Sequence, residues 1–590
     1  MNRKPTLAGY QILGCFLIGV ASFLCMTGAR ARGTGDGQKE NSFHEFHRMH
    51  PDFIRILRNH PTPWLHLETL SRSRTGVTRD ALILGRFSGS PSANQKPLTV
   101  FITPALNRPG RATRIAALAL FQHLANPQIR NHLLDHLTLV FFLVHRTGRP
   151  VADNPNPPVP GLRSPWDVHN VDLLTAQSRR ARDWLRLFQH WKPDVVMELG
   201  HVQTATWRAQ CLFGGAPHAL LPHPLSRVAH RLLSEARAIW QQRHVKVRSW
   251  FRLRNSASPS LGIITVPGHL SDPVPYSALN GALAFQWIWK GHSYGNRSST
   301  RLWKTLDSWF GLLIQDRLKI LKARAQGHDI VHSDPVSVHL PLPRQLVQEP
   351  TPFMLHTYAY DETLSPISGT VWVRYNRHKP RNYLVPRFGR RFVTLQQPDI
   401  AGYLVPAAFT RTLHLLARQG IQMKTFRKPR TLRVIADHLD GIRWNIPPET
   451  RVPTIRSYRA TARTRVLTYP TGSVFIPLNQ RRAALVVALL DPHSPDNLLY
   501  LGFFRSMFDR LPRTHQNRLE SIARQLLRTH PQLVRGFLRR ILDHRFADSP
   551  RSRLDFFYRH LYRDPVSRHL YPVAEWPQET DHAGLSLPPS

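Results

Sequence analysis

Cysteine is scarce in this chain of 590 residues, which contains only three. Cys15 and Cys25 lie in an apolar N-terminal stretch, so Cys211 is the one thiol beyond it. A single thiol cannot form an internal disulfide. Nothing near Cys211 in the sequence supplies a general base in a known pattern, so we expect it to be a small buried apolar residue.

Acidic residues are also few, because 37 Asp and Glu stand against 80 Lys and Arg, giving a formal net charge of +43. Such a surplus suits nucleic acid, an anionic envelope surface or an acidic compartment. The arginines are spread from Arg30 to Arg568 and form no basic arm, and the sequence contains no recognisable nucleic-acid module. We therefore expect a general surface adaptation and no specific nucleic-acid partner.

Long apolar runs are absent except at Leu7–Met26. Arg3 and Lys4 precede this run and the small-x-small pattern Ala29–Ala31 follows it, which predicts a secretory signal peptide over 1–31. The run is about 20 residues long, so an uncleaved membrane anchor is the alternative. We expect an exported protein, periplasmic or extracellular, whose membrane contact is limited to this segment if it stays uncleaved.

Strands that alternate with helices follow a Gly-rich linker at 32–41. This alternation predicts an α/β domain over 42–334, with a mixed, mostly parallel sheet flanked by helices. The predicted elements include Leu98–Thr103, Arg111–Leu124, Leu137–Val144, Leu173–His190 and Asp194–Leu199.

The character of the sequence changes in its second half. Proline-rich spacing and short strands such as Thr370–Val373 and Tyr383–Val385 predict a smaller β-rich or α+β accessory domain over 335–470. Helical periodicity then predicts a mostly helical region over 471–590.

Several stretches resemble the zinc metallocarboxypeptidases, the carboxypeptidase A-like peptidases, and in particular their long exported bacterial members. Asp135–Val144 and His190–Leu199 resemble two core strands of that family with their junctions. Ala401–Ala407, Thr471–Gln480 and Asp491–Leu499 resemble the accessory region that follows the peptidase domain. The resemblance implies a carboxypeptidase-like sheet with a smaller accessory region behind it.

The zinc ligands that the resemblance implies are missing. The family holds zinc with a His-x-x-Glu pair and a later His, which leaves one position for a water. The corresponding positions here are Asn107, Gly110 and Gly200, and no Asp or Glu lies between residues 80 and 135. His201, one residue later, is a possible remnant ligand if the strand bulges; otherwise it is an ordinary strand-end histidine.

The general-base position of the family falls on Lys290, where a glutamate would be expected. No carboxylate lies anywhere between Asp272 and Asp307. A lysine acts as a base only where burial favours its neutral form, so a solvated or paired lysine is the simpler interpretation.

The residues that would bind a substrate carboxylate are altered as well. Asn170-Val171-Asp172 resembles the family's Asn-Arg-Asp, but valine offers no bidentate fork. Asn170, Arg146 and Arg108 are the remaining candidates for holding an anion.

Three functions follow from these observations. The first is a pseudoenzyme of the metallocarboxypeptidase family, with no cofactor, that serves as a non-catalytic scaffold for a peptide or an anionic cell-envelope ligand. The second is an active zinc carboxypeptidase with rearranged ligands, which removes C-terminal residues from peptides. The third is a polyanion-binding envelope protein that relies on net charge alone.

Overall fold

The computed structural model describes residues 62–578 except for 73–76, 87–95, 105–110, 125, 147–171, 203–206, 266–268, 291–295, 334–335, 348, 368, 398–399, 446–453, 505–519, 522, 525–526, 529–530 and 562–568. The chain divides into two compact units. Unit 1 comprises the residues up to 396 together with 418–420, and unit 2 comprises the remainder.

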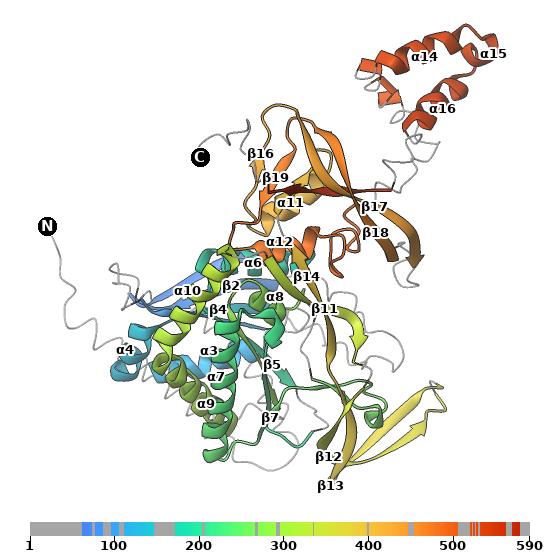
Figure 1. The fold of residues 1–590 in the computed structure, drawn as a ribbon. Coiled ribbons are helices and arrows are strands. Elements are labelled where there is room, and N and C mark those ends of the chain that lie inside the picture. Colours follow the sequence, from blue (N-terminus) through green and yellow to red (C-terminus); the bar gives the residue numbers. More distant parts are fainter. Residues whose placement is uncertain are drawn as a thin grey trace, which may run out of the picture. The chain divides into compact units, whose positions relative to one another are not determined.

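Unit 1 is built around a mixed sheet (Figure 1). Its eight described strands are β1 (Leu65–Arg72), β2 (Val77–Leu84), β3 (Leu98–Pro104), β4 (Leu137–Arg146), β5 (Val195–Val202), β6 (Cys211–Gly215), β7 (Val247–Ser249) and β10 (Leu283–Lys290). They are ordered β1-β2-β4-β3-β5-β10-β6-β7. The central strands β4, β3, β5 and β10 are parallel, whereas β2 and β6 join them antiparallel on either side. The predicted mixed sheet is confirmed, with its parallel strands at the centre.

Helices pack on both faces of this sheet. Ile102 of β3 pairs with Met197 of β5, so these two side chains share one face and Phe101 lies on the other. Trp309 approaches Met197, with 3.1 Å between Nε1 and Sδ, and Trp184 packs on Phe101 with 5.3 Å between ring centroids. The described helices of unit 1 are α3 (Arg111–Leu124), α4 (Pro127–His136), α5 (Asp172–Thr175), α6 (Arg179–Trp191), α7 (His223–Gln242), α8 (Pro273–Leu279), α9 (Asn296–Gln315) and α10 (Arg317–Ser333).

Most elements predicted for unit 1 are confirmed, since the predicted strands correspond to β3, β4 and β5 and the helix at 111–124 is α3. The single helix predicted over Leu173–His190 is wrong, because α5 and α6 are separate. Ala176 adopts a positive φ of 49° between them. Ser178 then caps α6 by accepting a hydrogen bond from the Ala181 N–H at 3.0 Å, as serine does at helix N-termini.

A second set of strands in unit 1 forms two smaller sheets. The strands are β8 (Arg252–Leu253), β9 (Ile263–Ile264), β11 (Val336–Leu346), β12 (Thr351–Leu364), β13 (Val371–Phe388) and β14 (Arg390–Gln397). The sheets are ordered β12-β13-β9-β8 and β11-β14, and the long antiparallel pair is β12 with β13. The two short strands predicted at Thr370–Val373 and Tyr383–Val385 are parts of the one long strand β13. Pro380 lies between them, and the pairing register shifts between Tyr358 and Ala359 opposite it. A bulge of this kind accommodates a proline within a strand.

Unit 2 contains an antiparallel sheet of six described strands in the order β16-β19-β15-β20-β17-β18. They are β15 (Ile400–Val405), β16 (Lys424–Thr425), β17 (Arg430–Asn445), β18 (Thr454–Tyr469), β19 (Val474–Pro477) and β20 (Leu570–Pro577). The described helices between β15 and β20 are α11 (Thr410–Arg418), α12 (Ala483–Leu490), α14 (Pro531–Ile541), α15 (His544–Ala547) and α16 (Pro550–Leu561). β20 lies between β15 and β17, although it comes last in the described sequence.

The predicted leader (1–31) and linker (32–41) lie outside the described residues. The predicted domain boundaries at 334/335 and 470/471, and the role of the second half as an accessory region, stay predictions. Among the residues that the structure describes, no helix has both the length and the apolar character needed to cross a membrane.

The aromatic packing in the core of unit 1 leads to a prediction about the stability of the protein. Trp240 of α7 is fully buried and stacks on Trp287 of β10, with 4.6 Å between ring centroids. Trp240→Ala should lower the free energy of unfolding by about 3–5 kcal/mol, because a large cavity replaces the ring. Leu318→Ala on α10, where the leucine is 54% exposed, is the control, and urea unfolding followed by tryptophan fluorescence measures both. Equal effects of the two substitutions would contradict this account of the core.

Candidate functional site

The carboxyl ends of three neighbouring strands meet at one edge of the unit 1 sheet. β5 lies between β3 and β10 and is parallel to both. Pro104 at the end of β3 pairs with Leu199, while Ile288 and Trp289 of β10 pair with Gly200 and His201. The positions that the resemblance singled out on β5 and β10 are therefore adjacent, at the edge where α/β proteins form their sites.

Gly200, at the third zinc position, has no side chain and packs closely against Ile288 of β10. A Cβ atom built there would lie 3.2 Å from Cγ1 of Ile288, closer than ordinary side-chain contacts. The pairing of β5 with β10 continues through His201 without a register shift, so it contains no bulge of the kind that would bring His201 to the position of Gly200. A ligand role for His201 stays a prediction.

Lys290 ends β10 and is held by hydrogen bonds within unit 1. Its Nζ donates to the carbonyl oxygen of Trp207 at 2.7 Å and lies 3.3 Å from the hydroxyl oxygen of Tyr358. The same ammonium lies 5.2 Å from the centre of the Tyr358 ring, a cation–π distance. The Lys290 nitrogen is thus directed at structural partners. No sequence pattern pointed to Trp207 or Tyr358 as partners of Lys290, because they come from a different loop and hairpin.

The structure describes only some of the other candidate residues. Arg146 ends β4, where it pairs with Val77. Asn107, Arg108, Gly110 and Asn170 lie outside the described residues, so their proposed roles stay predictions.

The residues that the structure describes at this edge do not form a zinc site. Gly200 has no side chain to offer, Lys290 is a cation, and the sequence supplies no carboxylate between residues 80 and 135. Within the described part of the chain, no group of three or more His, Cys, Asp or Glu side chains is arranged to hold a metal ion. The donor set of a catalytic zinc site, three protein ligands with one open position, is not assembled from the described residues.

Cys211 is buried at the start of β6. Burial raises the pKa of its thiol to about 12, because the low-dielectric interior disfavours the thiolate. The thiolate is the nucleophilic form, so Cys211 is an apolar core residue, as expected from the sequence.

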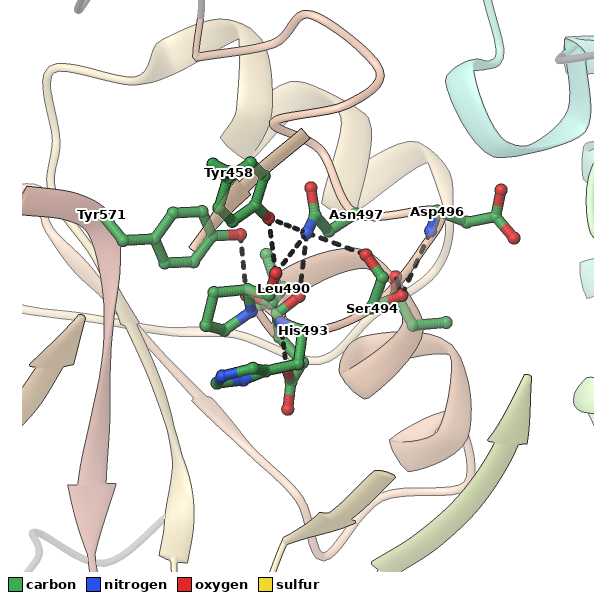
Figure 2. Close-up of polar contacts among 10 residues, drawn as sticks. Tyr458, Leu490, His493, Ser494, Asp496, Asn497 and Tyr571 are labelled. Carbon is green, nitrogen blue, oxygen red and sulfur yellow. Dashed lines mark hydrogen bonds and ion pairs between the residues drawn. The ribbon is translucent and has the colours of Figure 1, made fainter. Parts of the chain in front are cut away.

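A second polar cluster lies in unit 2, in the loop that follows α12 (Figure 2). Asn497 organises it, since its Nδ2 lies 2.6 Å from the Tyr458 hydroxyl and 2.9 Å from the carbonyl oxygen of Ser494. The Asn497 side-chain oxygen accepts hydrogen bonds from the N–H groups of Leu499 and Tyr500, both at 3.0 Å. One amide therefore fixes both ends of the loop.

Carboxylates gather beside this loop. Asp491 accepts a hydrogen bond from the backbone N–H of His493 at 2.6 Å, and its Oδ1 lies 3.3 Å from Nδ1 of the same histidine. Asp437 of β17 and Glu575 of β20 interact electrostatically with both residues. No local sequence pattern identifies this cluster, because its members come from two strands and a loop that are far apart in the chain.

Burial and mutual repulsion alter the pKa values in this cluster. Burial, reinforced by Asp491 and Asp437, raises the pKa of Glu575 to about 7. Burial likewise raises the pKa of Asp437. The hydrogen bond with Asp491 raises the pKa of His493. All three groups hold their protons more tightly in the folded protein than in the unfolded chain.

No protein-family model and no curated protein matches the chain. Among solved structures, it is similar to a metallo-carboxypeptidase from Burkholderia cenocepacia at 13% identity, covering 46% of this chain and 69% of that one with a TM-score of 0.32. A metallo-carboxypeptidase from Pseudomonas aeruginosa is similar at 14% identity, with coverages of 43% and 65% and a TM-score of 0.30. Carboxypeptidase A from Helicoverpa armigera is similar at 9% identity, with coverages of 44% and 70% and a TM-score of 0.29. A likeness of this size does not decide the family.

The buried thiol generates one prediction. In a chain carrying C15S and C25S, Cys211 should react with Ellman's reagent at pH 8 only as fast as the protein opens, because the native thiol is buried and protonated. The control is the same chain in 6 M guanidinium chloride, where the thiol should react at the rate of a free cysteine. Rapid labelling of the native protein would contradict the burial of Cys211.

The unit 2 cluster generates a prediction about pH. Because Glu575 has an ordinary pKa of 4.5 and a folded value of about 7, the folded state binds more protons and loses stability as the pH rises through that range. Amides of β17 and β20 should therefore exchange hydrogen faster at pH 8 than at pH 5, after correction for the intrinsic rate. Glu575→Gln should remove up to about 3 kcal/mol of this difference, at 1.36 kcal/mol per pKa unit. Asp440→Asn, at an exposed position on β17, should change it little; an unchanged profile in Glu575→Gln would contradict the assignment.

Proposed function

We propose that the protein is an exported, non-catalytic binding protein built on a carboxypeptidase-like α/β scaffold. The observation that carries this proposal is the position of Lys290. It stands at the general-base position of the resemblance, and its nitrogen is directed to the Trp207 carbonyl and the Tyr358 hydroxyl. A general base needs a lone pair within reach of the proton that it removes.

The chain also lacks the groups that a metallopeptidase needs around that position. No carboxylate is available in the sequence between residues 272 and 307 to replace the missing glutamate. Gly200 is packed against Ile288 and offers no ligand. The chemistry of metal-activated water therefore has neither its metal ligands nor its base.

Positive charge at the same edge supports an anionic ligand. Arg146 ends β4, which is in the parallel set with β3, β5 and β10. Arg108 and Asn170 complete the group of candidate side chains in the proposal. Arginine binds a carboxylate through two parallel hydrogen bonds, so a peptide with a free C-terminal carboxylate is the ligand class that we favour.

The test uses an acidic peptide, fluorescein-Ala-Ala-Glu-Glu, with a free or an amidated C-terminus. The free peptide should bind more tightly than the amide, and EDTA should leave its fluorescence anisotropy unchanged. Arg146→Gln should weaken binding of the free peptide about tenfold or more, since a charge-assisted hydrogen bond contributes about 1.5–3 kcal/mol. Arg433→Gln, an equal change of charge at an exposed position in unit 2, is the matched control.

Other outcomes separate the competing functions. About one zinc per purified chain, together with chelator-sensitive release of C-terminal residues, would overturn the proposal in favour of an active carboxypeptidase. Affinity that ignores the C-terminal carboxylate and collapses with modest added salt would overturn it in favour of general polyanion binding.

A further inference from the structure

Three carboxylates in unit 2 lack the partners that a chain so rich in Arg and Lys could easily supply. Three other acids of this protein with little exposed side-chain surface are paired with arginine: Asp183 with Arg79, Asp194 with Arg324, and Asp316 with Arg231. Among the described residues, Asp437 and Glu575 have no ion pair, and Asp491 is paired only with His493. Leaving a carboxylate buried without a partner is costly, so the arrangement points to a cation that comes from outside the chain.

Strand pairing places these groups on one face of the unit 2 sheet. Glu575 of β20 is opposite Ile435 of β17 on one side and Tyr403 of β15 on the other. Side chains alternate along a strand, so Asp437 shares the face of Ile435, Glu575 and Tyr403. The opposite face carries the apolar cluster to which Ala436 and others belong. The polar face is therefore assembled from three adjacent strands.

Two buried polar atoms on this face have no hydrogen-bond partner among the residues that the structure describes. Asp437 is 2% exposed, and its Oδ1 is unsatisfied. The hydroxyl of Tyr403, which is fully buried, is also unsatisfied. Both interact electrostatically with Asp491 on the loop after α12. Unsatisfied groups of this kind are rare in the interior of proteins and call for an explanation.

We infer that Asp437, Glu575, Asp491 and Tyr403 form a binding site for an organic cation, an ammonium or guanidinium group. Such a group donates several hydrogen bonds at once, which matches the acceptors that the unpaired Asp437 oxygen, the Tyr403 hydroxyl and the Glu575 carboxylate offer. Glu575 is partly exposed and the His493 side chain is 57% exposed, so these two residues are the members of the cluster that contact solvent.

A bare metal ion fits the same groups less well. The described residues contain no set of three or more His, Cys, Asp or Glu side chains with the spacing that a metal ion requires. A guanidinium or ammonium group is larger and donates hydrogen bonds to oxygens that do not converge on one point. Tyrosine hydroxyls also suit an N–H donor.

Binding of a cation should expel protons from this cluster. The pKa of Glu575 is raised to about 7. Asp437, Asp491 and His493 are titratable groups that interact electrostatically with its carboxylate. A cation that pairs with the ionised carboxylates competes with the protons that they hold. Affinity should therefore rise several-fold from pH 6 to pH 8, and titration calorimetry in buffers of different ionisation enthalpy should show proton release.

The experiment titrates N-acetyl-arginine amide into the full chain, with N-acetyl-citrulline amide as a neutral ligand of the same shape. The arginine derivative should bind and the citrulline derivative should not. Putrescine distinguishes a free amine from a peptide side chain as the source of the cation. Asp437→Asn and Glu575→Gln should each weaken binding of the arginine derivative at least tenfold, and Asp440→Asn on the same strand should leave it unchanged.

Three results would overturn this inference. The first is equal binding of the arginine and citrulline derivatives, and the second is unaltered binding of the arginine derivative in both Asp437→Asn and Glu575→Gln. The third is that zinc chloride binds, that Asp437→Asn abolishes this binding, and that no organic cation binds. Circular dichroism of each variant checks that it is folded, and Glu575→Gln should be the more stable protein at pH 8. The inference does not rest on the proposed function, because peptide binding in unit 1 and cation binding in unit 2 are measured with different ligands and different variants.

Discussion

The parallel pairing of β5 with β3 and β10 is the constraint on which the candidate site of unit 1 depends. Parallel strands that lie side by side end at the same edge, so residues far apart in the sequence become neighbours there. The pairing runs without a register shift from Val195 to Val202 on the β10 side. It fixes Gly200 against Ile288 and leaves Lys290 next to the hairpin that carries Tyr358. The strand ends at this edge are therefore adjacent, as they are where α/β proteins form their sites, but Gly200 and Lys290 are not residues that a zinc site uses.

The two units use charge in opposite ways. Unit 1 pairs two of its buried acids with arginine, Asp194 with Arg324 and Asp316 with Arg231. Among the described residues of unit 2, His493 is the basic group that interacts electrostatically with both Asp437 and Glu575, and neither carboxylate forms an ion pair with arginine or lysine. In a protein with a formal net charge of +43, a local concentration of carboxylates creates a negative potential that small cations can distinguish from the rest of the surface. The formal net charge alone does not indicate this local cluster of carboxylates.

The sequence was sufficient for elements with strong local signals. The helix at 111–124 and the buried strand β4 were predictable, because their apolar patterns match one period without interruption. The break before α6 was missed because it depends on the conformation of Ala176 and on the Ser178 cap. β13 was predicted as two strands because Pro380 and the bulge beside it, formed by the unpaired residues 377–379 of β13, interrupt the strand pattern at its middle. The Lys290 contacts and the unit 2 cluster could not be predicted from the sequence, since each is made by residues brought together only by tertiary packing.

The central place of β20 affects how unit 2 can fold. β20 separates β15 from β17, yet its residues follow those of β15 by more than 160 positions in the sequence. Until residues 570–577 have emerged from the ribosome, the sheet consists of two incomplete halves with unpaired edges, and such edges invite association with other chains. Contacts of such long sequence separation also close slowly. The sheet of unit 2 therefore cannot be completed before residues 570–577 are available, and a chaperone that shields the edges of β15 and β17 would act in the interval before then.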